Sequence, residues 1–411
     1  MSRLEELIAE LCPDGVEYKT LGEVVEFRAG WSFPVGEQGV LNGDYPFFKV
    51  ADMNNSIMYM GKAQNYISKE TAKKLRCKPA PKGTIIFPKV GATMGTNKKR
   101  ILSEESCYDN NVMGIIAKGV DAMFLYYLLS KVPLLDFANG TGAVPSLDKT
   151  RMENYRIPLP PLEVQREIVR ILDAFTELTA ELTAELTARK RQYEYYRDDL
   201  CNFTNRPDVP FLSVGELFEF KNGLNKGKEF FGKGYPIVNF TDVFNNRWMT
   251  KETLKGLVEV TDKEKELYGA KKNDVFFTRT SETQEEIGMT SVLLDDIEGC
   301  VFSGFVLRAR PKTDLLLPKF CSYYFSSYSM RKDIVRYSTF TTRALTSGSK
   351  LSKLMFPLPS IAEQERIVAI LDRFDKLCND ISEGIPAEIE ARRKQYEHYR
   401  DRLLTFKEKT A

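Results

Sequence analysis

The segment PLPPLEVQREIVRILD at residues 158–173 returns as PLPSIAEQERIVAILD at residues 357–372. The two segments are offset by 357 − 158 = 199 residues and are identical at nine of 16 positions. Each begins with Pro-Leu-Pro, which a helix interior excludes, and continues with apolar residues every three or four positions. Similarity at such a distance indicates a duplicated chain in which each copy ends in an amphipathic helix.

A second pair of segments extends both helices. ARKRQYEYYRDDLCNF at 188–203 matches ARRKQYEHYRDRLLTF at 391–406 at ten of 16 positions, with an offset of 391 − 188 = 203. The second copy is therefore 203 − 199 = 4 residues longer between the two blocks, and the repeat TAELTAEL at 179–186 lies in this interval. A Gly-Ile-Pro at 384–386 interrupts only the second helix, and we expect a bend or break there.

The regions that precede the helices are related more weakly. VEYKTLGEVVEFRAG at 16–30 aligns with VPFLSVGELFEFKNG at 209–223, and KGTIIFPK at 82–89 aligns with KNDVFFTR at 272–279. Short β-rich runs separated by Gly, Asn and Pro predict mixed, strand-rich domains, which makes the fold class α+β. The expected segments are an N-terminal helix at 1–15, a first domain at 16–157, a first helical region at 158–203, a second domain at 204–356 and a second helical region at 357–411.

An apolar stripe runs along both helical regions. Its residues recur at steps of three, four or seven, which is typical of a coiled-coil seam. The residues expected to pair the helices or dock other subunits are Ile168, Leu172, Phe175, Leu178, Leu182, Leu186, Tyr193, Tyr196, Leu200, Ile367, Leu371, Phe374, Leu377, Ile381, Tyr396, Tyr399 and Leu403.

Composition excludes several classes of protein. No run of about 18 apolar residues occurs, so we expect no membrane span. Seven scattered cysteines without C-x-x-C are typical of reduced, packed thiols in a cytoplasmic protein. The single histidine, His398, excludes two-histidine metal sites, and we expect it to be solvated on a helix face. The sequence contains no complete catalytic motif, so we assign no catalytic residue and no metal ligand.

Two basic blocks stand out although the net charge is only +2. Residues 62–100 hold 11 Lys or Arg and one acid, and residues 303–353 hold 10 Lys or Arg and two acids. Such clustering favours two contacts with a polyanion, and solvated lysines at a domain rim are the alternative.

The first domain offers a loop with two glycines and a basic end at residues 89–100. The cations at 98–100 are expected at phosphates and the polar residues before them at base edges, while a plain hairpin with a solvated tip is the alternative. A core position for Trp31 remains open beside an exposed one. The candidate DNA contacts are Trp31, Lys89, Thr93, Thr96, Asn97, Lys98, Lys99, Arg100, Asn110 and Asn111.

The second domain offers loops at matching places. Arg279 has the geometry to contact guanine through two hydrogen bonds, and Gln284 has the amide that reads adenine. The candidate contacts are Lys221, Asn222, Asn225, Lys226, Arg279, Thr280, Ser281, Gln284, Thr342 and Arg343.

The two Pro-Leu-Pro helix starts and the block RRKQYEHYRDRLL at 392–404, with its earlier copy, resemble the specificity subunits of type I restriction–modification systems. The TAEL tandem is similar to the IC branch of that family. The resemblance covers essentially the whole chain. It implies two target-recognition domains separated by two long helices that pair as an antiparallel coiled coil, in a chain that is not itself an enzyme.

The same resemblance implies the partners. Each recognition domain would read one half of a split, asymmetric target in double-stranded DNA, and two methyltransferase subunits would dock on the helices. Restriction/translocase subunits would join through the complex. S-adenosylmethionine, ATP and Mg would be used by those subunits for adenine-N6 methylation and ATP-dependent cleavage, with no cofactor bound by this chain. The residues alone leave an alternative, a coiled-coil scaffold whose basic domains bind RNA or acidic proteins.

The TAEL repeat predicts an adjustable spacer. One four-residue unit adds about 6 Å of helix, because the rise is about 1.5 Å per residue. That length corresponds to roughly one or two base pairs at about 3.4 Å each. A stretch that is merely a good helix former is the alternative.

Overall fold

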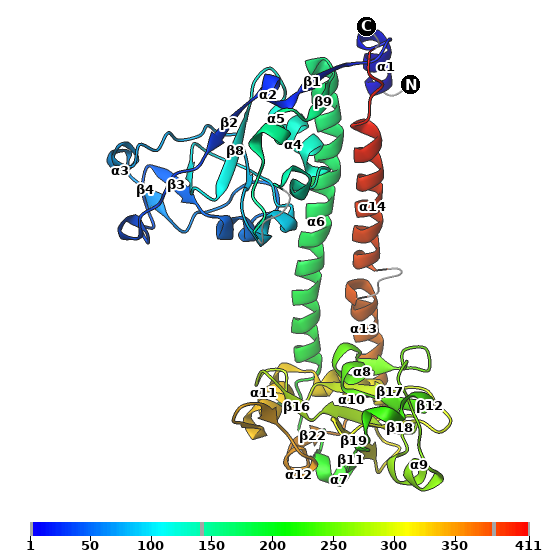
Figure 1. Ribbon diagram of the computed structural model, residues 1–411. Helices are drawn as coiled ribbons and strands as arrows, with labels where there is room; N and C mark the ends of the chain where they lie inside the picture. Colours follow the sequence, from blue (N-terminus) through cyan, green and yellow to red (C-terminus); the bar gives the residue numbers. More distant parts are fainter. Residues whose placement is uncertain (1–2, 140–143, 380–383, 410–411) are drawn as a thin grey trace. The chain divides into compact units, whose positions relative to one another are not determined.

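The computed structural model describes residues 3–139, 144–379 and 384–409, and it divides into two compact units (Figure 1). Unit 1 comprises residues 1–181 and 389–411, and unit 2 comprises residues 182–388. The first division falls inside TAELTAEL. Each unit therefore holds one strand-rich domain, called domain 1 or domain 2, together with part of each helical region.

Domain 1 is built on a four-stranded sheet of order β2-β8-β5-β6, a three-stranded sheet of order β4-β3-β7 and the pair β1-β9. The four-stranded sheet is antiparallel throughout, and β3 pairs in parallel with β7. The elements of unit 1 are α1 (Arg3–Leu11), β1 (Glu17–Thr20), α2 (Leu21–Val24), β2 (Val25–Ala29), η1 (Val35–Glu37), β3 (Tyr45–Phe48), η2 (Val50–Asn55), β4 (Tyr66–Ile67), α3 (Lys69–Lys74), β5 (Ile85–Pro88), η3 (Ala92–Thr96), β6 (Arg100–Ile101), β7 (Cys107–Tyr108), β8 (Val112–Ala117), α4 (Ala122–Ser130), η4 (Leu134–Phe137), α5 (Lys149–Glu153), β9 (Arg156–Leu159), the first part of α6 (Leu162–Leu200) and most of α14 (Ile385–Leu403).

Domain 2 repeats this plan on a five-stranded sheet of order β11-β19-β15-β17-β13. Two three-stranded sheets, β14-β12-β18 and β16-β21-β20, and the pair β10-β22 complete it. The elements of unit 2 are the last part of α6, β10 (Phe211–Ser213), α7 (Val214–Leu217), β11 (Phe218–Asn222), η5 (Lys228–Phe230), β12 (Phe231–Val238), α8 (Phe240–Asn245), β13 (Trp248–Met249), β14 (Leu257–Val258), α9 (Asp262–Tyr268), β15 (Val275–Thr278), β16 (Thr280–Ser281), β17 (Thr290–Leu293), β18 (Val301–Phe302), β19 (Val306–Pro311), α10 (Pro318–Phe325), α11 (Tyr328–Tyr337), β20 (Thr339–Phe340), β21 (Ala344–Leu345), α12 (Gly348–Leu351), β22 (Met355–Pro357) and α13 (Ile361–Asn379).

The strand orders confirm the duplication that the sequence predicts. The central trio β2-β8-β5 corresponds to β11-β19-β15, and β4-β3-β7 corresponds to β14-β12-β18. In both copies the middle strand of the smaller sheet has one antiparallel and one parallel neighbour. The predicted α+β class is likewise confirmed, and the expected N-terminal helix is α1.

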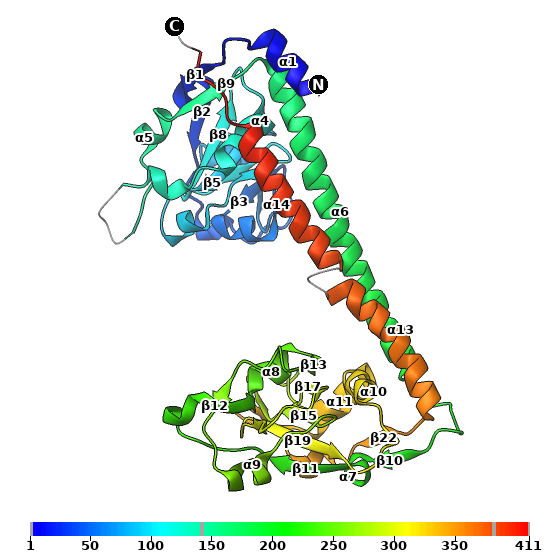
Figure 2. The same cartoon turned by 90° about the vertical axis from the view of Figure 1, so that its right-hand side faces the viewer.

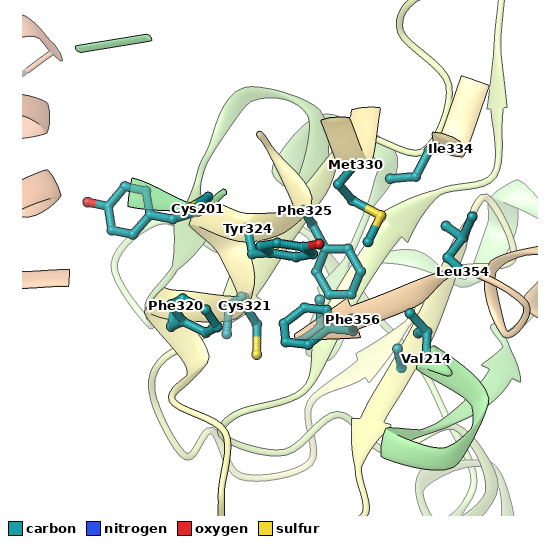
Figure 3. Packing of buried hydrophobic residues seen from close by; sticks show 14 of the residues in the cluster. Cys201, Val214, Phe320, Cys321, Tyr324, Phe325, Met330, Ile334, Leu354 and Phe356 are labelled. Atoms are coloured by element: carbon teal, nitrogen blue, oxygen red, sulfur yellow. The ribbon is translucent and has the colours of Figure 1, made fainter. Parts of the chain in front are cut away.

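The core of domain 2 is an aromatic cluster between α10 and the strand that precedes α13 (Figure 3). Phe356 of β22 is fully buried, and its ring centroid lies 4.6 Å from that of Tyr324 and 5.1 Å from that of Phe325. Edge-on and tilted rings at these distances are favourable packing geometries. Because β22 leads directly into α13, this cluster attaches the helix to the domain.

Helix α6 is continuous over 39 residues, so the TAEL tandem lies inside one uninterrupted helix. Its early part lies beside α14 in both views (Figures 1 and 2), with Phe175 stacked on Tyr399 at 5.4 Å. Its late part contacts α13, with Tyr196 stacked on Phe374 at 5.3 Å. Contacts that come early along α6 are made with α14, and contacts that come late along α6 are made with α13, which precedes α14. This reversed order confirms the antiparallel arrangement of the helices.

The predicted stripe residues divide into buried and exposed groups. Ile168, Leu172, Tyr193, Ile367 and Leu371 are buried in the cores of the units. Leu178, Tyr196, Leu377 and Tyr399 remain exposed, and the other described stripe residues are half-buried: Phe175, Leu182, Leu186, Leu200, Phe374, Tyr396 and Leu403. Ile381 and residues 380–383 around it lie outside the described residues. Helix α13 ends at Asn379 and α14 begins at Ile385, so Pro386 occupies the first turn of α14, where proline is tolerated.

A buried glutamine attaches each helix to its domain. This explains why a Gln occurs at the same position of the first helical turns after Pro-Leu-Pro in both copies. Gln165 accepts a hydrogen bond from Asp121 N at 2.8 Å and donates one to Pro160 O at 2.7 Å. Gln364 accepts from Leu317 N at 2.8 Å and donates to Pro359 O at 2.9 Å. Each amide therefore joins the start of the long helix to the start of α4 or α10.

Candidate nucleic-acid interface

In domain 1, three separate segments converge on Lys89, at the end of β5. The backbone N–H of Lys89 donates to Asn111 O at 2.9 Å, and its carbonyl accepts from Leu147 N at 2.8 Å. Trp31 N donates to Tyr108 O at 2.9 Å, which brings the end of β2 beside the same turn. We call this convergence the Lys89 edge.

Domain 2 has the same arrangement around Arg279. The backbone N–H of Arg279 donates to Phe305 O at 3.1 Å, and its carbonyl accepts from Thr346 N at 3.1 Å. Leu224 N donates to Phe302 O, and Gly304 N donates to Leu224 O, both at 2.8 Å. We call this convergence the Arg279 edge. A cation in each domain is thus held between a β-turn and the segment that leads into the last short helix and last strand of the domain.

A glycine is required beside each edge. A Cβ on Gly30 would lie 1.9 Å from Asp109 O, and a Cβ on Gly223 would lie 2.1 Å from Ser303 O. No side chain fits at these distances, so the glycine at the end of RAG and of KNG permits the close approach of the two backbones. The sequence alignment finds both glycines, and the structure shows their physical reason.

The edges gather part of the predicted contact residues. Asn110 and Asn111 are exposed at the Lys89 edge, while Trp31 is half-buried, with its ring 5.8 Å from that of Tyr108. The Arg279 edge gathers Asn222, Asn225, Arg279, Thr280, Thr342 and Arg343. The side chains of Lys89 and Arg279 form no hydrogen bond or ion pair with the described residues.

The polar and basic side chains of the first loop form hydrogen bonds within domain 1. Lys98 is hydrogen-bonded to Asn54, and the guanidinium of Arg100 donates to Lys99 O at 2.8 Å. Thr93 and Thr96 are exposed, but their hydroxyls donate to backbone carbonyls within the loop. These cations and hydroxyls are therefore engaged inside domain 1.

The prediction that Lys99 contacts phosphate needs correction, because Lys99 is buried. Only 3% of the residue is exposed, and its Nζ donates to Asn97 Oδ1 at 2.7 Å and to Val132 O at 2.8 Å. The same Asn97 oxygen accepts from Leu134 N at 2.9 Å. Burial lowers the pKa of Lys99 to about 7, since a buried site disfavours the ammonium form. Lys99 and Asn97 together hold the loop in place, and they do not extend from it towards a ligand.

Domain 2 fixes the corresponding loop with a different cation. The guanidinium of Arg331, on α11, donates to the carbonyls of Glu285, Ile287 and Gly288 at 2.6–2.8 Å. Burial lowers the pKa of Arg331 to about 10. The loop that carries Gln284 is therefore held by its backbone, and Gln284 itself is half-buried.

Three further candidates of domain 2 are engaged internally. Lys226 forms an ion pair with Glu264 at 2.8 Å and donates to Glu259 O at 2.8 Å. Ser281 is buried, and Lys221 lies 6.0 Å from the ring of Tyr268. These contacts make Lys221, Lys226 and Ser281 weaker candidates than the residues at the Arg279 edge.

Phe305 is the edge residue that the sequence reasoning missed. It lies at the place in domain 2 that Asn111 occupies in domain 1, and 66% of it is exposed. The signal was available, because Asp109-Asn110-Asn111 and Ser303-Gly304-Phe305 each precede the strand that pairs with the one ending at the cation.

Other features bear on chemistry. All seven cysteines are free and buried, and His398 is exposed, as predicted. Within residues 3–139, 144–379 and 384–409, no group of three His, Cys, Asp or Glu side chains is placed to hold a metal ion. In the same described ranges no helix has the length and apolar character needed to cross a membrane.

Comparison with known proteins identifies the family. The family model described as "Type I restriction modification DNA specificity domain" matches residues 13–189 and 208–391, which together include most of both repeats. The chain belongs to this family. It is a DNA specificity subunit of a type I restriction–modification system, which supports the predicted function over the scaffold alternative.

Individual relatives agree with this assignment. The specificity subunit is 33% identical over 320 residues to the "Type I restriction enzyme EcoR124I/EcoR124II specificity subunit" of Escherichia coli, covering 73% of each chain. A solved chain from a study of "complex assembly and conformational transition of the type I R-M system" has a TM-score of 0.64 at 17% identity, covering 95% of this chain and 98% of that one. The S subunit from M. genitalium has a TM-score of 0.51 at 14% identity, with coverage of 95% and 96%.

Membership in the family determines the division of chemistry. A specificity subunit supplies DNA recognition and is itself non-catalytic. S-adenosylmethionine and ATP are used by the other subunits of such systems. The residues of interest in this chain are therefore those that select DNA and those that join it to its partners.

Proposed function

We propose that domains 1 and 2, at residues 16–157 and 204–356, each read one half of a split, asymmetric duplex target. The observation that carries this proposal is the repeated edge, in which Lys89 and Arg279 occupy the same backbone position. Both cations follow a fully buried strand, so their backbones are fixed, while their side chains form no hydrogen bond or ion pair with the described residues. A cation on a rigid backbone is suited to phosphate or to the guanine edge.

The proposed DNA contacts follow from exposure and partners. The Lys89 edge contributes Lys89, Asn110 and Asn111, with Trp31 at the end of β2. Thr93, Thr96 and Lys98 stay candidates in the loop that follows, because none of the three is buried. The Arg279 edge contributes Asn222, Asn225, Arg279, Thr280, Gln284, Thr342 and Arg343. Asn97 and Arg100 act with Lys99 inside the loop, and Lys221, Lys226 and Ser281 act inside domain 2.

The test uses the assembled enzyme and the target found by mapping methylated adenines in cells that carry the system. Lys89→Met should weaken binding to duplexes that contain the first half-site. Arg279→Met should weaken binding to duplexes that contain the second half-site. Each change is expected to cost about 1–3 kcal/mol, as for a lost specific contact. Lys82→Met and Lys272→Met, at exposed lysines before the same strands, are the matched controls. Equal binding by all four variants would refute the proposal.

We also propose that the chain belongs to the IC branch of the family and that the TAEL tandem sets the spacer between the half-sites. The tandem lies within the continuous helix α6, so an inserted unit lengthens a helix rather than a loop. A third unit should add about 6 Å and lengthen the preferred spacer by roughly one base pair. Both half-site sequences should stay unchanged.

Methylome mapping of a variant with three TAEL units tests the spacer directly. A variant in which TAEL is replaced by the equally helical EAAA keeps the length and should keep the spacer. A spacer that is unchanged by the third unit, or changed by the sequence swap, would reject the ruler role.

We infer that two methyltransferase subunits dock on the helices and that restriction/translocase subunits join through the complex, which uses S-adenosylmethionine, ATP and Mg outside this chain. The exposed Leu178 and Leu377 support this, as does an apolar groove of about 600 Å³ in unit 1 lined by residues that include Leu4, Ile8 and Phe406. Leu178→Glu and Leu377→Glu should weaken co-purification with the methyltransferase subunit. Ala180→Glu, on an exposed position of the same helix, is the control. The free, buried thiols favour a cytoplasmic location.

A further inference from the structure

Phe305 is an exposed aromatic side chain on a fixed backbone. It forms the turn between β18 and β19, and its neighbours Ser303 and Val306 are buried. Its carbonyl accepts the hydrogen bond from Arg279 N at 3.1 Å, and the adjacent Gly304 N donates to Leu224 O at 2.8 Å. The ring is therefore held at the Arg279 edge, but most of its surface faces solvent in the isolated chain.

The surroundings of the ring combine polar and apolar groups. Asn225 lies directly beside the turn, because a Cβ on Gly304 would be 2.0 Å from its Oδ1. Beyond Arg279, the β16-β21-β20 sheet adds Phe340 and Leu345, which are 51% and 43% exposed. A guanidinium, an amide and apolar side chains are the groups that read the major-groove edges of guanine, adenine and thymine, respectively.

Carboxylates border this edge. Glu282, Glu285 and Glu286 follow on the next turn, and Glu282 lies 3.7 Å from Arg343. A phosphate-only contact would be opposed by these charges, whereas a carboxylate at a base edge accepts from cytosine. The charge pattern therefore favours base contacts at the Arg279 edge.

The contrast with domain 1 indicates what Phe305 does. Lys89 N donates to Asn111 O as Arg279 N donates to Phe305 O, so the two residues share one backbone position. One side chain is an amide with donors and an acceptor, and the other is an apolar ring. Two domains that read different half-sites with one scaffold need different chemistry at such a position.

We propose that Phe305 is a specificity-determining residue that contacts the C5-methyl group of a thymine in the half-site of domain 2. The inference rests on the proposed reading of one half-site by each domain. At the same position, domain 1 reads its half-site through the amides of Asn110 and Asn111. A rigid turn places the ring without loss of backbone freedom, and apolar contact with the thymine methyl is the major-groove readout open to phenylalanine.

The experiment measures binding of the assembled methyltransferase complex to its methylome-defined duplex. Uracil replaces each thymine of the second half-site in turn, on either strand, which removes the C5-methyl group alone. One substitution should weaken binding by the unmodified protein roughly tenfold, as a single lost base contact does. Phe305→Ala should weaken binding to the normal duplex by a similar factor and should be insensitive to uracil at that position. Phe305→Leu should keep part of the sensitivity, because it keeps an apolar contact.

Two control variants show that the effect is local. Tyr328→Ala removes an aromatic side chain that is 68% exposed on α11 of the same unit, and it should change neither binding nor the uracil response. Asn111→Ala should weaken binding through the first half-site, with no dependence on methyl groups in the second.

Four outcomes would overturn the inference. They are normal binding by Phe305→Ala, an equal uracil effect in the variant and the unmodified protein, loss of complex assembly in Phe305→Ala, and a Phe305-dependent rise in 2-aminopurine fluorescence, which would indicate a ring inserted between bases. Failure of the proposed function is distinguishable, because Arg279→Met would then also bind normally. If Arg279→Met weakens binding but Phe305→Ala does not, only the present inference fails.

Discussion

Unit 1 and unit 2 attach their strand-rich domains to the long helices through the same two polar contacts, but unit 2 adds an arginine contact that unit 1 lacks. The shared contacts are the buried glutamines, Gln165 and Gln364, and a tyrosine–aspartate pair. Tyr127 OH donates to Asp173 at 2.5 Å in unit 1, and Tyr323 OH donates to Asp372 at 2.7 Å in unit 2. Burial, and then the bond to the carboxylate, raises the pKa of both phenols, so both remain donors.

The added contact centres on Arg247. Its Nε lies 3.2 Å from Asp375 Oδ1, and its guanidinium lies 5.2 Å from the ring of Tyr193 and 4.9 Å from that of Tyr323. Arg247 O accepts a hydrogen bond from Val292 N in unit 2. In unit 1, Met58 O accepts the matching bond from Ile101 N, so Met58 occupies the position of Arg247. Methionine thus stands where arginine joins the domain to α6 and α13.

This difference shows which contacts the duplication preserved. The glutamine and tyrosine contacts lie at the start of each helix, where the sequence repeat is strongest. The glutamines bond matching backbone groups in both copies, and the tyrosines bond matching aspartates. The Arg247 contact lies farther along the helices, where the copies have diverged. We therefore expect the shared contacts to matter alike in both units and the Arg247 contact to matter only in unit 2.

The largest expected effect comes from the core beside the shared contacts. Phe356→Ala should lower the free energy of unfolding of unit 2 by about 3–5 kcal/mol, because it opens a cavity in the aromatic cluster. Ile157→Ala, at the matching position of unit 1, should cost about 2–5 kcal/mol there. Hydrogen exchange of the full chain, followed by mass spectrometry, assigns each loss to its unit. A loss spread equally over both units would contradict separate cores.

Removing the glutamines tests whether the shared contacts are equivalent. Gln364→Ala leaves the Leu317 N–H and the Leu315 and Pro359 carbonyls without their side-chain partner, and should cost about 2–3 kcal/mol. Gln165→Ala should cost slightly less, because it removes one hydrogen bond fewer. Thermal unfolding of both variants measures the losses. A near-neutral result at one site only would show that the two attachments are not equivalent.

Arg247→Met transfers the side chain of unit 1 to unit 2. It should cost about 2 kcal/mol, because Asp375 loses its ion-pair partner and the rings of Tyr193 and Tyr323 each lose a cation. Asp375→Asn in the Arg247→Met background should recover part of the loss, since no unpaired carboxylate remains. Met58→Leu in unit 1 is the matched control and should be nearly neutral. Equal losses in the single and double variants would show that the ion pair contributes nothing.

The smallest effect concerns Lys99, the cation that fixes the loop of domain 1. Lys99 has a folded pKa of about 7, below the ordinary 10.5, so between these values the unfolded chain binds a proton that the folded chain does not. The stability of unit 1 should therefore rise by about 1 kcal/mol between pH 7.5 and 8.5, and level off below pH 7 where both states are protonated. The difference in melting temperature between the unmodified chain and Lys99→Met should change with pH accordingly. A pH-independent difference would contradict a lysine that is neutral when folded.

The sequence by itself determined the duplication, the α+β class, the two long helices and the family. These follow from local patterns: proline and apolar spacing set where a helix begins, and an internal repeat is visible without any fold. The required Gly30 and Gly223 and the matching positions of Lys89 and Arg279 were also within reach of the alignment. Each of these two pairs can be inferred by comparing the residue at one position with its counterpart in the other copy.

Only the tertiary structure decided which polar and aromatic residues are free to bind. Lys99 has the sequence context of a solvated cation, but the distant segment at Val132 and Leu134 bonds Lys99 and the Asn97 that accepts from it. Phe305 has the context of a core residue between two β runs, yet the turn that binds Arg279 leaves its ring outside. Burial depends on which remote segments pack together, and that information lies in the whole fold rather than in the neighbouring residues.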